Sequence, residues 1–85
     1  MRVETPEWLS RRVGQLKAGV TSNSWLVLVG DSPIFRIEAR PAKGRFTYYL
    51  TETTNGRTWA GESTFATSEE ALRQGLEALR DRLGW

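Results

Sequence analysis

Hydrophobic and polar residues alternate along two stretches in the middle of the chain. Over Ile34–Arg40, apolar residues take every second position between charged ones, and Arg45–Thr53 repeats the alternation with aromatic and β-branched residues. A period of two is that of a strand with one buried face, so both stretches are predicted to be strands. Two shorter stretches, Ser24–Gly30 and Arg57–Glu62, are predicted to be strands as well.

The N-terminal part of the chain follows a helical pattern instead. Thr5 is a good N-cap, and Leu9, Val13 and Leu16 fall on one face at helical spacing. Gly19 is a natural end for such a helix. A helix is therefore predicted from Thr5 to Gly19.

A second helix is predicted after Thr67, and its pattern is clearer. Thr67 and Glu70 have the spacing of a capping box, in which each side chain hydrogen-bonds to the backbone of the other residue. Gly84 suits the left-handed conformation that commonly ends a helix. Four leucines at helical spacing form one stripe, at Leu72, Leu76, Leu79 and Leu83.

The residues between the predicted strands are typical of turns. Pro41–Gly44 is predicted to be a four-residue turn, and Asn55 with Gly56 a two-residue hairpin turn. The two-residue length of the Asn55–Gly56 turn places Glu52 opposite Trp59. Residues that lie opposite each other share a face of the sheet, so both hairpins predict the same buried face. Its members are Phe35, Ile37, Ala39, Phe46, Tyr48, Leu50 and Trp59.

These elements predict a single domain of the α+β class over residues 1–85. Their order is α-β-β-β-β-α, with an antiparallel sheet and both helices on one of its faces. If Ser24–Gly30 does not join the sheet, the order becomes α-β-β-β-α.

Composition narrows the classes of function. The 85 residues include no cysteine and no histidine, so the usual zinc ligands and the Ser–His or Cys–His nucleophiles cannot be assembled. We therefore expect no enzymatic activity, no metal site and no cofactor. The absence of cysteine favours the reducing cytoplasm. The longest apolar run, Trp25–Val29, is too short to cross a membrane.

Charge is nearly balanced, at a net +2, but it is unevenly distributed. Basic residues dominate up to residue 58 and acidic residues from there onward. The predicted pairing places Arg36 opposite Tyr49 and Arg40 opposite Arg45 on the other face of the sheet, with Lys43 in the adjoining turn. Basic groups beside an exposed ring can bind phosphates while the ring contacts bases or sugars. An ordinary solvated sheet face would have a similar composition.

The region Gly44–Ala71 also follows the order of a known family pattern. Its matching positions are Gly44, Arg45, Phe46, Asn55, Gly56, Arg57, Trp59, Gly61, Phe65 and the helix start Thr67–Ala71. This order resembles the small DNA-binding domains of the plant AP2 type and the arm-binding domains of tyrosine integrases. In those domains a three-stranded sheet packs on one helix and its open face enters the major groove of DNA. The resemblance implies contacts with DNA from Arg36, Arg40, Arg45 and Arg57, although Glu38 interrupts the arginine-rich first strand of that family.

Two functions fit these observations. The first is a small nucleic-acid-binding module, with DNA as the expected ligand. The second is a protein-interaction module without catalytic activity, such as a regulator or inhibitor of phage or mobile-element origin, which would pair with its partner through the unprotected final strand. Either would act as a monomer or a homodimer, away from membranes. The candidate nucleic-acid-binding residues are Arg36, Arg40, Lys43, Arg45, Tyr49 and Arg57.

Overall fold

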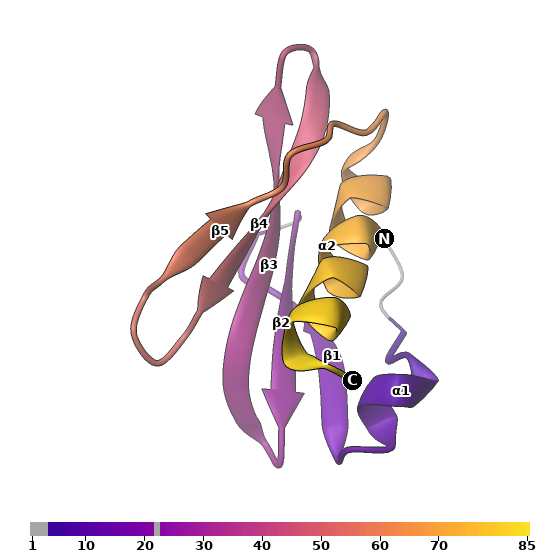
Figure 1. Ribbon diagram of the computed structural model, residues 1–85, viewed down its shortest axis with the longest axis vertical. Helices are drawn as coiled ribbons and strands as arrows, with labels where there is room; N and C mark the ends of the chain where they lie inside the picture. Colours follow the sequence, from indigo (N-terminus) through magenta and orange to yellow (C-terminus); the bar gives the residue numbers. More distant parts are fainter. Residues whose placement is uncertain (1–3, 22) are drawn as a thin grey trace.

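The computed structural model describes residues 4–21 and 23–85, which form one antiparallel sheet and two helices (Figure 1). The elements in chain order are α1 (Glu7–Ser10), β1 (Gly14–Ala18), β2 (Ser24–Val29), β3 (Ser32–Ala42), β4 (Arg45–Glu52), β5 (Thr58–Ala60) and α2 (Ser68–Leu83). The strands lie in the sheet in the order β1-β2-β3-β4-β5, and every neighbouring pair is antiparallel. The predicted α+β class is confirmed, and the Ser24–Gly30 stretch joins the sheet as β2.

The first predicted helix is wrong beyond one turn. α1 ends at Ser10, Val13 adopts a left-handed φ of 58°, and the chain then enters β1, so the sheet has five strands rather than four. Leu16 pairs with Val27 of β2 and is buried there, whereas Val13 is 77% exposed. A helix would have placed these two side chains on the same face. Burial and backbone pairing next to β2 therefore outweigh the helical spacing of the apolar residues.

Two contacts hold the start of the chain against the sheet. The Thr5 side chain does not cap α1, whose N-cap is Pro6, and its Oγ1 instead accepts a hydrogen bond from the Leu16 N–H at 3.0 Å. Leu9 is fully buried, and a Cβ at Gly14 would collide with its Cδ1. Glycine at position 14 thus gives the Leu9 side chain the space it needs.

Both predicted hairpin registers are wrong by two residues, in opposite directions. β3 and β4 are joined by the two residues Lys43 and Gly44, with Ile37 opposite Leu50. The β4–β5 turn is longer than predicted, since Leu50 lies opposite Trp59 and the Glu52 N–H donates to the Arg57 carbonyl at 2.8 Å. Consequently Arg36 lies opposite Thr51 rather than Tyr49, and Arg40 opposite Thr47 rather than Arg45.

A shift of two residues leaves every side chain on its predicted face, so the predicted buried face is confirmed. Phe35, Ile37, Ala39 and Leu50 are buried in the core, and Phe46, Tyr48 and Trp59 pack against it. On this side α2 lies across β3 and β4, and Figure 1 shows α1 on the same side of the sheet.

The second helix begins and ends where predicted, with the Thr67 half of the predicted capping box, and three of the four leucines of its predicted stripe are buried. The Thr67 side chain accepts a hydrogen bond from the Glu70 N–H at 3.1 Å, and Gly84 ends the helix with a φ of 72°. Leu72, Leu76 and Leu79 are buried in the core shared with the sheet. Neither helix, within residues 4–21 and 23–85, is long and apolar enough to span a lipid bilayer.

Candidate nucleic-acid interface

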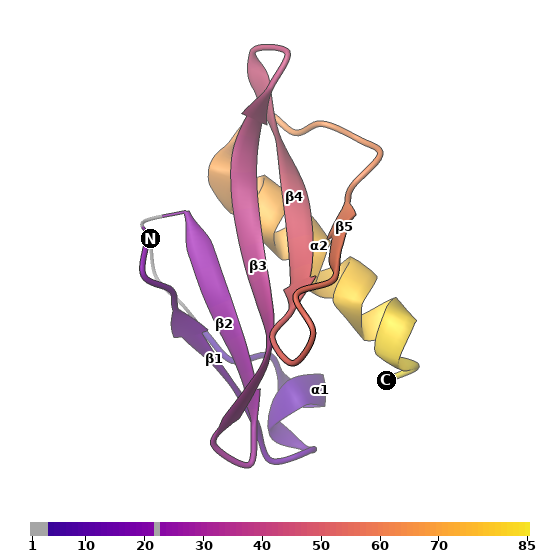
Figure 2. The same cartoon turned by 90° about the vertical axis from the view of Figure 1, so that its left-hand side faces the viewer.

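The face of the sheet turned away from both helices is covered by neither of them, and we call it the open face (Figure 2). One line of paired residues crosses it over all five strands. In strand order this line consists of Lys17, Leu26, Arg36, Thr51 and Thr58. Lys17, Arg36 and Thr58 are exposed, and the other two are half-buried. The line therefore presents two separated cations to solvent, with an apolar side chain between them.

A second line lies beside the first and contains an acidic residue, Glu38. This residue lies opposite Tyr49 on β4, and its Oε1 accepts a hydrogen bond from Arg40 Nε at 2.5 Å. The Arg40 guanidinium also stacks over the Tyr49 ring, with its Cζ 4.3 Å from the ring centroid. These three side chains form a compact unit that we call the Arg40–Tyr49 stack. Its ion pair offsets one of the positive charges on this face.

Arg45 and Lys43 lie at the end of the β3–β4 hairpin, away from the centre of the sheet. Arg45 donates to Thr64 Oγ1 from Nε at 3.1 Å and to the Thr64 carbonyl from Nη2 at 3.5 Å. Thr47 beside it is buried, and its hydroxyl bonds to the carbonyls of Gly61 and Ser63. These hydrogen bonds thus hold the segment before α2 against this end of the open face. They also use some of the N–H groups of the Arg45 guanidinium.

The predicted site residues consequently fall into separate places. Arg36, Arg40 and Tyr49 lie together near the middle of the open face, with the β3–β4 hairpin residues beyond them. Arg57, which only the family resemblance implied, lies in the β4–β5 loop, and Figure 2 shows that loop at the opposite end of β4 from the β3–β4 hairpin. The six residues do not form one cluster.

Sequence reasoning missed Lys17 and Leu26 as residues of this face. Lys17 falls within the predicted first helix, and this prediction does not place Lys17 beside β2. The local sequence contains a usable indication, since Gln15 and Lys17 flank Leu16 in strand alternation directly after Gly14. With Lys17 added, the residues of the five strands give the open face four basic side chains, Lys17, Arg36, Arg40 and Arg45, against Glu38.

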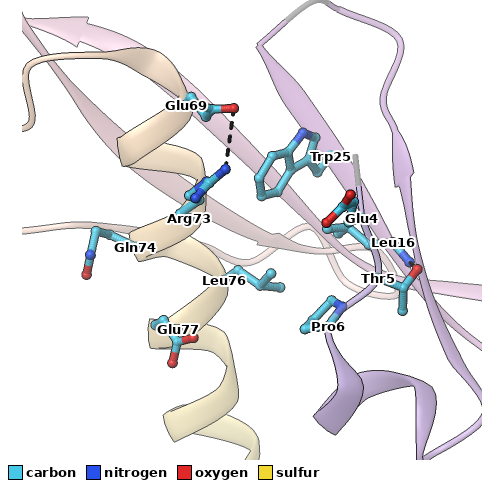
Figure 3. A pocket seen from close by; sticks show the side chains of 10 residues that line it. All are labelled: Glu4, Thr5, Pro6, Leu16, Trp25, Glu69, Arg73, Gln74, Leu76 and Glu77. Carbon is cyan, nitrogen blue, oxygen red and sulfur yellow. Dashed lines mark hydrogen bonds and ion pairs between the residues drawn. The ribbon is translucent and has the colours of Figure 1, made fainter. Parts of the chain in front are cut away.

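A groove of about 450 Å³ lies on the other side of the sheet, between α2 and the N-terminal segment (Figure 3). Its apolar lining is already packed, because Leu16, Trp25 and Leu76 are each less than a tenth exposed. Glu69 and Glu77 also line it, and Glu69 lies 3.6 Å from Arg73. The groove thus offers little apolar area to a ligand, and its carboxylates would repel an anion.

Comparison of the chain with protein-family models, with curated proteins and with solved structures finds no match.

Proposed function

We propose that this protein is a small nucleic-acid-binding module that uses its open face, with DNA as the expected ligand. The observation that carries the proposal is the excess of positive charge on the open face. The strands give the open face four basic residues and one acidic residue, whereas α2 on the covered side has four acidic residues and three arginines. A basic face attracts phosphates through counterion release, and the covered side, whose charges nearly balance, does not compete for them.

Binding to DNA and RNA oligonucleotides at two salt concentrations tests this function. Affinity should fall steeply as salt rises, because each neutralised phosphate releases counterions. Changing both Lys17→Gln and Arg36→Gln should weaken binding and lower the slope of log K against log salt by about one for each phosphate that the variant no longer neutralises.

A matched control removes the same charge from the covered side. Arg11 and Arg73 are exposed residues of that side, so Arg11→Gln with Arg73→Gln changes the net charge equally. This variant should bind almost as the parent does. Equal losses from both double variants, or no binding of any nucleic acid at low salt, would contradict the proposal.

A protein-interaction function is favoured by one feature, the free edge of β5. The backbone groups of Arg57 and Gly61 bond to β4, so antiparallel alternation turns those of Thr58 and Ala60 towards the free edge. An extended segment of a partner could add a strand there. Ala60→Pro would block such pairing without removing a bond to β4, and Ala60→Val is its control. Loss of partner binding in the proline variant alone would identify this edge as the contact.

A further inference from the structure

The open face carries half-buried apolar and aromatic side chains as well as charged ones. Leu26 and Leu28 of β2 lie on one side of the charged open-face residues of β3 and Tyr49 of β4 lies on the other, and all three are half-buried although this face is turned away from the core. Lys17 lies on the strand beside the leucines, and Arg36 is directly opposite Leu26. Side chains of this kind suit the flat faces of nucleobases, while the cations around them suit phosphates. A double helix presents the reverse arrangement, with its phosphates outermost and its base faces stacked inside.

The Arg40–Tyr49 stack provides a flat surface at this position. The ring supports one side of the guanidinium at 4.3 Å, and the Glu38 carboxylate fixes its orientation through Nε. The Arg40 side chain remains about half exposed. Guanidinium planes and aromatic rings are the surfaces on which proteins stack unpaired bases. The stack is therefore oriented before any ligand arrives.

The width of the sheet acts against a duplex. Five strands at about 4.8 Å spacing make a sheet about 19 Å wide. The major groove of B-DNA is about 12 Å wide and admits a helix or a two-stranded ribbon. The sheet as a whole is thus too wide to lie flat in that groove. A two-stranded part such as the β3–β4 hairpin is narrow enough to enter, but one of the basic side chains of this hairpin, Arg45, is already bonded to Thr64.

From these observations we infer that the open face binds unpaired nucleotides in preference to a duplex. A base stacks on the Arg40 guanidinium above Tyr49, and phosphates contact Lys17 and Arg36. This inference rests on the proposed nucleic-acid-binding function and specifies its substrate class.

The test compares one mixed-sequence DNA oligonucleotide as a single strand and annealed to its complement, by fluorescence anisotropy at low salt. The single strand should bind at least about tenfold more tightly, because one stacked base accounts for a factor of that order. Tyr49→Ala should weaken single-strand binding by about tenfold, and Tyr49→Phe, which keeps the ring, should change it by less than about twofold. Circular dichroism and thermal melting establish that both variants are folded.

Two substitutions of Arg40 separate the contribution of stacking to binding from the contribution of charge, without disturbing the core. Arg40→Lys keeps the positive charge but loses the planar group, and Arg40→Ala loses both. If Arg40 stacks a base, the lysine variant should bind the single strand several-fold more weakly while keeping the parent salt dependence. Parent-like affinity in Arg40→Lys would overturn the stacking assignment, whatever the outcome at Tyr49.

The remaining outcomes distinguish this inference from the function on which it rests. If the duplex binds as tightly as the single strand or more tightly, and Lys43→Gln at the tip of the β3–β4 hairpin weakens that binding, the preference for unpaired nucleotides is overturned. The proposed nucleic-acid-binding function would still hold. Failure to bind either form at low salt would remove both.

Discussion

At the scale of single residues, the contact between α2 and the sheet depends on Gly75. A Cβ at this position would lie 2.8 Å from Ile37 Cγ2 and 3.0 Å from Tyr48 Cβ. Both neighbours belong to the central strands, so neither can move freely. Glycine costs helix propensity in the middle of α2, and the close approach of helix and sheet explains why it stands there.

Gly75→Ala should therefore destabilise the protein, although alanine is the better helix former. The added methyl group overpacks the contact with Ile37 and Tyr48, and we expect a loss of about 1–3 kcal/mol in the free energy of unfolding. Urea denaturation measures it. Gln74→Ala, at the exposed neighbouring position, is the control and should change stability by less than about 0.5 kcal/mol. A more stable Gly75→Ala protein would mean that α2 and the sheet have room for the extra methyl group.

At the scale of elements, the strands are easier to predict than their connections. Strand alternation has a period of two, so errors of two residues at both hairpins leave the buried and open faces correct. The first helix is wrong because Leu9 and Leu16 fit a helical face as well as they fit the observed turn and strand, and only the presence of β2 decides between them. Lys17 is missing from the predicted site for the same reason. The grouping of Arg40 with Tyr49 depends on the true register, which local sequence does not determine.

The β3–β4 turn gives a prediction at this scale. Lys43 and Gly44 have φ angles of 52° and 76°, the arrangement of a two-residue hairpin turn that favours asparagine followed by glycine. Lysine is disfavoured in the left-handed region, so Lys43→Asn should raise the free energy of unfolding by about 0.5–1 kcal/mol. Lys43→Gln removes the same charge but keeps a residue that is disfavoured in the left-handed region. Equal melting temperatures for these two variants would show that the turn is not strained at Lys43.

At the scale of the whole molecule, the two ends of the described chain are joined by arginines and indole rings. The Trp8 and Trp85 rings lie 6.4 Å apart between centroids. Arg12 stacks over Trp85 at 4.8 Å, and Arg80 lies over Trp8 at 5.6 Å. Each arginine thus comes from the segment opposite to its ring, and the four side chains tie α1 to the end of α2.

A double-mutant cycle on Trp8→Ala and Trp85→Ala measures this connection. Each single change should lower stability, and the coupling between them should be about 0.5–1.5 kcal/mol, the range found for aromatic pairs that touch. A cycle between Trp8 and Trp59, whose ring packs on Phe35, serves as the reference and should be close to additive. Additive losses in the first cycle would show that the two ends are stabilised independently.

The sequential order of the strands has a consequence for folding kinetics. Each strand pairs with the one before it, so the sheet has low contact order for a β-rich protein and its hairpins can close within microseconds. During synthesis β1–β4 can pair before α2 exists, and their apolar face then has nothing to cover it. We expect docking of α2, which brings Trp85 to Trp8, to be the last step and to limit the folding rate. A nascent chain that pauses before α2 would expose Phe35, Ile37 and Leu50 to aggregation.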